Sequence, residues 1–120
     1  MLLASTCVIV FVIAFHVWAL VLEMFLWTKP IGLRVFKQKP EQALASKKLA
    51  QNQGLYNGFL AAGLAWGLMH PTPEASFQIK MFFLMCVVIA GVFGAYTVGR
   101  NILFFQAVPA GLAIALLLLA

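Results

Sequence analysis

Apolar positions form four long runs along the chain, separated by short polar segments. No Asp, Glu, Lys or Arg occurs in residues 1–22, 51–73, 81–99 or 101–120. Each run is close to the roughly 20 residues that an α-helix needs to cross the hydrocarbon core of a bilayer. The alternating pattern of a membrane β-barrel strand is absent. The pattern therefore predicts an all-α protein, a four-transmembrane-helix bundle with helices at about 2–27, 40–69, 73–99 and 102–119.

Local signals at the ends of the runs refine these boundaries. Pro40 and Glu41 suit the first turn of a helix, so the second helix is expected to begin there and extend into the cytoplasm before entering the membrane. Thr72 is a good N-cap for the third helix. Residues 28–38, which contain a proline and a glycine, are predicted to form a loop. Pro109 is predicted to kink the last helix.

The composition excludes an ordinary soluble domain. Of the 120 residues, 64% are hydrophobic and 9% charged, and the mean hydropathy is +1.02. A soluble domain of this length cannot bury so large an apolar fraction. Since the predicted helices use almost the whole chain, residues 1–120 are expected to be a single integral membrane domain.

The basic residues are distributed unevenly, and this predicts the topology. Arg100 lies in the third connection and Lys80 near the second, whereas six of the eight basic residues lie in the first: Lys29, Arg34, Lys37, Lys39, Lys47 and Lys48. The positive-inside rule then places the first and third connections in the cytoplasm and both termini outside. The formal charge of +5 is expected to meet anionic lipid headgroups. Nucleic acid is not an expected partner, because aromatic side chains do not interleave with these charges.

Small residues recur at four-residue spacing on two of the predicted helices. One series is Gly54, Gly58 and Ala62, and another is Gly91, Ala95 and Gly99. Such stripes let helix backbones approach closely in a membrane. They predict packing within the bundle or between the subunits of a homo-oligomer, a trimer or a dimer.

Several polar side chains lie where a membrane helix would not be expected to carry them. Glu23 lies about one turn inside the cytoplasmic end of the first helix, and a lipid-facing carboxylate costs up to about 3 kcal/mol near the bilayer centre and less near the interface. Amide and phenol side chains open the second helix at the same predicted depth, and the third helix ends there. The candidate site residues are therefore Glu23, Asn52, Gln53, Tyr56, Asn57, Tyr96 and Arg100.

Two interpretations of this polar layer stay open. It is either a structural hydrogen-bond network between helices, or a polar pocket at the cytoplasmic leaflet that binds a small amphiphile or a lipid headgroup. If the protein is an enzyme, Tyr56 or Tyr96 would donate a hydrogen bond and Glu23 would handle a proton. No metal cluster, phosphate loop or redox cysteine pair is evident, so neither a metal nor a cofactor is expected from the residues.

Three segments resemble a known family. LEMFLWTKPIGLRVFK, LAQNQGLYNGFLAAGLAWG and GAYTVGRN are similar to the small bacterial membrane proteins of domain of unknown function 1304. The resemblance implies a multi-pass protein of the bacterial cytoplasmic (inner) membrane, and it implies no particular reaction.

A more distant similarity concerns the order of the parts. It resembles membrane-associated proteins in eicosanoid and glutathione metabolism, whose four-helix subunits usually form trimers. That resemblance implies a glutathione-transferase-like enzyme with glutathione as its cofactor. Lys48 and Asn52 match the family's basic residue and asparagine, whereas Gln51 and Leu55 replace its arginine and glutamate.

Small multidrug transporters form a third class with four helices and one glutamate in the first. In that family the glutamate exchanges protons for a cationic drug. Glu23 lies at a shallower predicted depth than the glutamate of that family. A proton-coupled transporter is therefore a further alternative.

Overall fold

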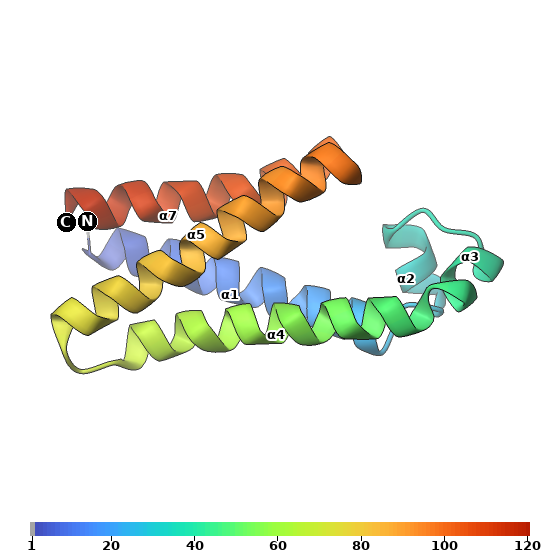
Figure 1. Cartoon of the computed structure of the whole chain (residues 1–120), viewed down its shortest axis with the longest axis horizontal. Helices are drawn as coiled ribbons and strands as arrows, with labels where there is room; N and C mark the ends of the chain where they lie inside the picture. The colour runs from blue at the N-terminus through green and yellow to red at the C-terminus, as the bar shows by residue number, and fades with distance from the viewer. Residues whose placement is uncertain (1) are drawn as a thin grey trace. The chain divides into compact units, whose positions relative to one another are not determined.

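The computed structural model describes residues 2–120, and within this range the chain is helical and contains no β-strand (Figure 1). The all-α prediction is confirmed. The helices are α1 (Leu2–Met24), α2 (Pro30–Val35), α3 (Pro40–Ala45), α4 (Lys47–Met69), α5 (Pro73–Thr97), α6 (Arg100–Ile102), the π-helical turn η1 (Leu103–Ala107) and α7 (Val108–Leu119).

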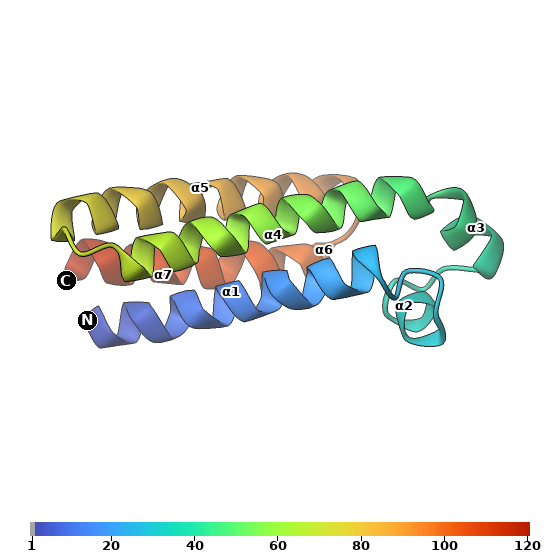
Figure 2. The same cartoon turned by 90° about the horizontal axis from the view of Figure 1, so that it is seen from below.

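The chain divides into two compact units, and the boundaries fall inside α1 and α4. Residues 1–15 and 60–120 form the first unit, and residues 16–59 form the second. The first unit therefore holds the beginning of α1, the end of α4 and all of α5 to α7. The second holds the end of α1, the short helices α2 and α3, and the beginning of α4 (Figure 2).

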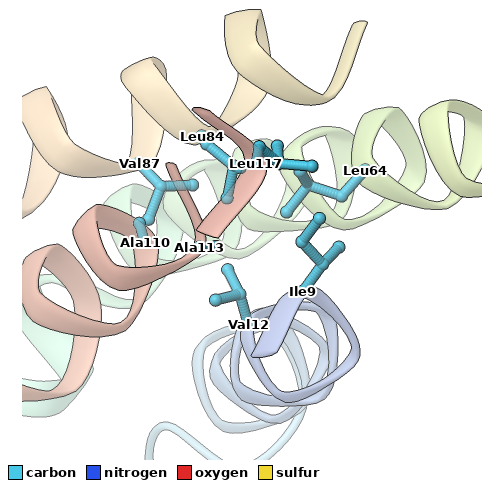
Figure 3. Close-up of a cluster of buried hydrophobic side chains, with 8 residues drawn as sticks. All are labelled: Ile9, Val12, Leu64, Leu84, Val87, Ala110, Ala113 and Leu117. Atoms are coloured by element: carbon cyan, nitrogen blue, oxygen red, sulfur yellow. The ribbon is translucent and has the colours of Figure 1, made fainter. Parts of the chain in front are cut away.

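The core of the first unit is built from side chains of α1, α4, α5 and α7 that point toward one another (Figure 3). Branched side chains from the first three helices meet two alanines on α7. The members are Ile9, Val12, Leu64, Leu84, Val87, Ala110, Ala113 and Leu117. Because Ala110 and Ala113 are fully buried, the backbone of α7 can lie close to its neighbours, as van der Waals packing requires.

One glycine fixes the closest approach between α5 and the last part of the chain. A Cβ added to Gly91 would lie 2.7 Å from the backbone nitrogen of Ala107. Real Cβ atoms do not come this close to backbone, so only glycine fits without a shift of the two segments. Gly91, a member of a predicted small-residue stripe, thus acts in packing inside the unit.

The predicted continuous helix 102–119 is wrong in detail, because η1 interrupts it before α7 begins at Val108. Pro109 lies in the first turn of α7. A proline ring in a regular helix clashes with the carbonyl group four residues earlier, here that of Phe105. The wider π-helical turn lies at that carbonyl and accommodates the ring. The irregularity predicted at Pro109 is therefore present as a π-turn on its N-terminal side.

α5 begins at Pro73 as predicted, and Thr72 is its N-cap residue with an extended backbone. The Thr72 side chain, however, makes no capping hydrogen bond. The Thr72 carbonyl oxygen accepts the N–H of Ser76 at 2.8 Å. The N–H of Thr72 donates to Nδ1 of His70 at 3.1 Å. A backbone group that a sharp turn would leave unpaired thus has a side-chain partner.

The prediction that residues 28–38 form a loop is wrong, because they contain α2. Pro30 occupies the first turn of this helix, where a missing N–H is tolerated. A Cβ on Gly32 would overlap the carbonyl oxygen of Leu26, so this glycine lets α2 fold back on the end of α1. The rings of Trp27 and Phe36 lie 4.7 Å apart and hold the corner together.

The predicted helix 40–69 is also divided, at Ser46 between α3 and α4. The Ser46 hydroxyl donates to the carbonyl oxygen of Gln42 at 2.9 Å and accepts the indole N–H of Trp27 at 3.1 Å. A serine hydroxyl bonded to the carbonyl four residues earlier competes with the helix and bends it. Trp27, which the prediction placed inside the first helix, instead packs with Ala43 and Ala50 in the core of the second unit.

Two of the described helices, α1 and α5, are long and apolar enough to cross a membrane, and residues 104–119 form a shorter apolar helix. Their outward surface is rich in large apolar side chains. On α5, Phe82, Ile89 and Phe93 are all more than 60% exposed. Contiguous apolar surface of this kind marks a face that meets lipid or another protein.

Substituting Gly91 tests the close approach. Gly91→Ala is expected to lower the free energy of unfolding by about 1–3 kcal/mol, because the added methyl group overpacks the contact with Ala107. Thermal unfolding of detergent-purified protein measures this. Gly111→Ala is the matched control, since a Cβ at Gly111 meets nothing within 4 Å. Equal melting temperatures for the two variants would contradict this packing.

Candidate functional site

The end of α1 and the beginning of α4 share a buried polar contact. Glu23 lies in the last turn of α1 and is only 8% exposed. Its carboxylate accepts a hydrogen bond from the side-chain amide of Asn57 on α4. Both residues belong to the second unit. The structure therefore brings together two of the predicted site residues, which lie on different helices and are 34 residues apart along the chain.

Gly54 makes this contact sterically feasible. A Cβ at Gly54 would lie 2.5 Å from Cγ of Met24 and 3.1 Å from Cβ of Glu23. One turn further along α4, a Cβ at Gly58 would lie 2.7 Å from Cδ1 of Leu20. A side chain at Gly54 would force the last turn of α1, which carries Glu23, to shift away from α4, whereas at Gly58 only the end of the Leu20 side chain would have to move. The small-residue series seen in the sequence is the signal that could have identified Gly54 as a positioning residue.

The Glu23 carboxylate has one amide partner and can accept further hydrogen bonds. A carboxylate can accept up to about four hydrogen bonds, and the Asn57 amide supplies one of them. Within the described part of the chain, Glu23 forms no ion pair with a Lys or Arg side chain.

Helical spacing separates the other amides from this contact. Gly54, Asn57 and Gly58 share the face of α4 that meets α1, because residues three and four apart are neighbours on a helix. Asn52 and Tyr56 lie on another face, Gln53 lies one turn before Asn57, and all three are exposed. In the described part of the chain none of these three side chains hydrogen-bonds to Glu23, and they form a polar surface on the first three turns of α4.

Tyr56 contributes an aromatic ring to that surface. Its side chain is 59% exposed, and its ring centroid lies 6.1 Å from that of Phe59. The phenol and the phenyl ring thus give the beginning of α4 a mixed polar and aromatic exterior. Such a surface is typical of a helix at the level of lipid headgroups.

Tyr96 and Arg100 belong to the first unit. Tyr96 is 87% exposed near the end of α5, and Arg100 is exposed at the beginning of α6. Their convergence with Glu23 stays a prediction. His16, seven residues before Glu23, is buried with 2% of its surface exposed.

The residues that could ligate metals are dispersed. In residues 2–120, no group of three or more His, Cys, Asp or Glu side chains could hold a metal ion. Cys7 and Cys86 are both free thiols. The chemistry that the site offers is hydrogen bonding by one carboxylate and several amides.

Removing the amide tests the buried contact. Asn57→Ala is expected to lower the free energy of unfolding by about 1–3 kcal/mol, because a buried carboxylate loses its partner. Thermal unfolding in detergent measures the loss, and a double-mutant cycle with Glu23→Gln isolates the coupling. The control is Asn52→Ala, an exposed amide on the same helix, with an expected change within about 0.5 kcal/mol. If both alanine variants unfold alike, the contact contributes nothing.

Comparisons with known proteins agree with part of the sequence-based resemblance. A curated relative, the "Uncharacterized protein YpaA" of Lactococcus lactis subsp. lactis (strain IL1403), is 30% identical over 95 residues, which cover 78% of this chain and 76% of the relative. No solved structure matches the chain. The similarity to the proteins of eicosanoid and glutathione metabolism finds no support in these comparisons and stays a prediction.

The family model described as "Protein of unknown function (DUF1304)" matches residues 10–118. This match covers nearly the whole chain and confirms the predicted resemblance. The chain therefore belongs to the DUF1304 family of proteins of unknown function.

Proposed function

We propose that the chain is a multi-pass protein of the bacterial cytoplasmic membrane that binds a small amphiphile or lipid headgroup at the inner headgroup layer. The observation that carries the proposal is the Glu23–Asn57 hydrogen bond, which holds a buried carboxylate beside an exposed amide surface on α4. In this proposal α1, α4, α5 and residues 104–119 are the four spans of the bundle.

The membrane part of the proposal is supported by length, exposure and charge. α1 and α5 are long and apolar enough to cross a bilayer, and large apolar side chains cover the outside of α5. Basic residues concentrate between positions 29 and 48, which favours a cytoplasmic first connection and outside termini. This arrangement brings the beginning of α4 to the inner leaflet.

The depth of the polar side chains favours a headgroup as the ligand. From Lys48 to Asn57 the helix rises about 14 Å, at 1.5 Å per residue. The headgroup region on each side of a bilayer is about 5–8 Å thick. The polar strip of Asn52, Gln53 and Asn57 would therefore reach from the headgroups to the edge of the hydrocarbon core. A molecule with a polar head and an apolar tail matches both environments.

The chemistry of the strip favours a headgroup that carries a hydrogen-bond donor. Glu23 offers acceptor capacity beyond the bond to Asn57. Asn52 and Gln53, each with an amide that donates and accepts, are exposed on the first turns of α4. An amine or hydroxyl group would bind the carboxylate, while phosphate or ester oxygens would accept from the amides.

A homo-oligomer, a trimer or a dimer, is part of the same proposal. Exposed amides on a membrane helix gain stability when a neighbouring helix or a ligand provides partners. A second copy of the chain could cover Asn52, Gln53 and Tyr56 without any ligand. In that case the polar layer would be a structural hydrogen-bond network. The purified oligomer would then carry no amphiphile, whereas ligand binding predicts that an amphiphile remains bound to it.

Native mass spectrometry of gently extracted protein tests the proposal. The expected result is a homo-oligomer that retains an amphiphile, with retention reduced about tenfold or more in Glu23→Gln, since a hydrogen bond to a charged group is lost. Gln51→Ala is the matched control, because it changes an exposed amide of α4 outside the strip. An assembled protein that carries no amphiphile, or one that keeps it equally in Glu23→Gln, would refute ligand binding.

Two further measurements address the alternative functions. A rise in melting temperature with glutathione would favour the transferase-like enzyme, because a ligand of the folded state stabilises it. Loss of ethidium resistance in cells that carry Glu23→Gln would favour a proton-coupled transporter. We expect neither effect, and either result would replace the proposal of headgroup binding.

A further inference from the structure

A cavity of about 630 Å³ lies in the first unit. It is bounded by the beginning of α1, the turn between α4 and α5, and the end of α7, which come together at one end of this unit (Figures 1 and 2). Its volume falls in the range of about 300–1,000 Å³ that is typical of small-molecule sites. None of its lining residues belongs to the Glu23 site.

The cavity wall is apolar on several sides and carries a few polar groups. Leu68, Phe77, Leu117 and Leu118 supply the apolar part. The polar lining side chains are Thr6, His70, Ser76 and Lys80. Such a division, apolar walls with a small number of polar groups, is the usual composition of a site for an amphiphilic molecule.

Lys80 is the unusual member of this lining. Its side chain is only 7% exposed, and it has no hydrogen-bond or ion-pair partner among the described residues. Lysine is almost never buried to this extent unless it is paired. A Cβ on Gly67 would lie 2.7 Å from Cγ of Lys80, so the aliphatic stem of Lys80 packs on the α4 backbone. The stem is covered but the ammonium nitrogen is not itself enclosed, so it is the group that an anionic ligand would neutralise.

Two other polar residues of the lining have their hydrogen-bond roles fixed by the backbone. Nδ1 of His70 accepts the N–H of Thr72 at 3.1 Å, which in a neutral imidazole leaves Nε2 as the donor. Ser76 donates its hydroxyl to the carbonyl oxygen of Gly67 at 2.6 Å. His70 therefore offers a second donor in the lining beside the ammonium group of Lys80.

No Asp or Glu side chain lines this cavity. Ala120 is also part of the lining. The charge of the lysine thus lacks a direct counter-ion from the described chain.

We propose that this cavity binds a single-chain amphiphile with an anionic headgroup, a carboxylate or a phosphate. The ammonium group of Lys80 neutralises the anion, and His70 donates a hydrogen bond to it. The apolar tail lies along Leu68, Phe77 and the leucines of α7. In the topology predicted by the basic residues, the 70–73 connection faces outside, so the ligand enters from the outer leaflet.

Titration calorimetry of protein purified in an uncharged maltoside detergent tests this site. The probes are dodecanoate, dodecyl phosphate, inorganic phosphate and dodecyltrimethylammonium, which has the same tail with the opposite charge. We expect both anionic amphiphiles to bind. Inorganic phosphate and the cationic amphiphile should bind at least about tenfold more weakly.

Variants at Lys80 identify the cation. Lys80→Met keeps the length of the stem and removes the charge, so it should weaken dodecanoate binding by at least about tenfold. Lys80→Arg should restore most of the affinity. Lys48→Met, at an exposed lysine of α4, should bind dodecanoate like the wild type. Thr6→Phe narrows the cavity without changing a charge and should weaken both anionic amphiphiles.

Several results would overturn the proposal. Wild-type affinity in Lys80→Met would show that the lysine does not hold the anion. Equal binding of the cationic amphiphile would show that the tail alone is recognised, and equal binding of inorganic phosphate would remove the tail from the site. These outcomes do not involve Glu23, so they are distinct from a failure of headgroup binding at the inner leaflet.

Discussion

The close approach of helix backbones at small residues is the constraint on which the rest of this structure depends. In the proposed membrane location, a chain that is 64% hydrophobic gains little from hiding apolar side chains, because lipid tails are equally apolar. Packing must then come from van der Waals contact. Gly54 and Gly58 receive the side chains of α1, and Gly91 receives the backbone at Ala107. A side chain at Gly54 or Gly91 would separate the helices.

These contacts also decide where polar groups can be buried. Gly54 lets Glu23 reach Asn57, and Gly67 accepts the stem of Lys80 while its carbonyl oxygen accepts the Ser76 hydroxyl. In both units a glycine on α4 lies beside a buried charged side chain. The small residues therefore also create the space in which ionisable side chains are held.

The long apolar runs and local end signals were sufficient to predict an all-α chain and the beginning of α5 at Pro73. Of the polar layer predicted around Glu23, the structure shows the hydrogen bond with Asn57. The sequence signals could not show which amides face α1, since Asn52, Gln53 and Asn57 differ only in their angular position. The corner at Gly32, the break at Ser46 and the π-turn before Pro109 were missed or only partly predicted. Each of these three features depends on a contact with a distant residue or on local strain, and the periodicity of apolar residues contains no information about either.

The corner formed by α2 has a mechanical consequence. Gly32 lies so close to the carbonyl oxygen of Leu26 that not even a methyl group fits, and the tilted rings of Trp27 and Phe36, 4.7 Å apart, contact each other at the same bend. This connection is therefore rigid. If the lysines of the basic segment bound a charged bilayer surface, a displacement of that segment would be transmitted to the last turn of α1, where Glu23 lies. A flexible linker would absorb the same displacement.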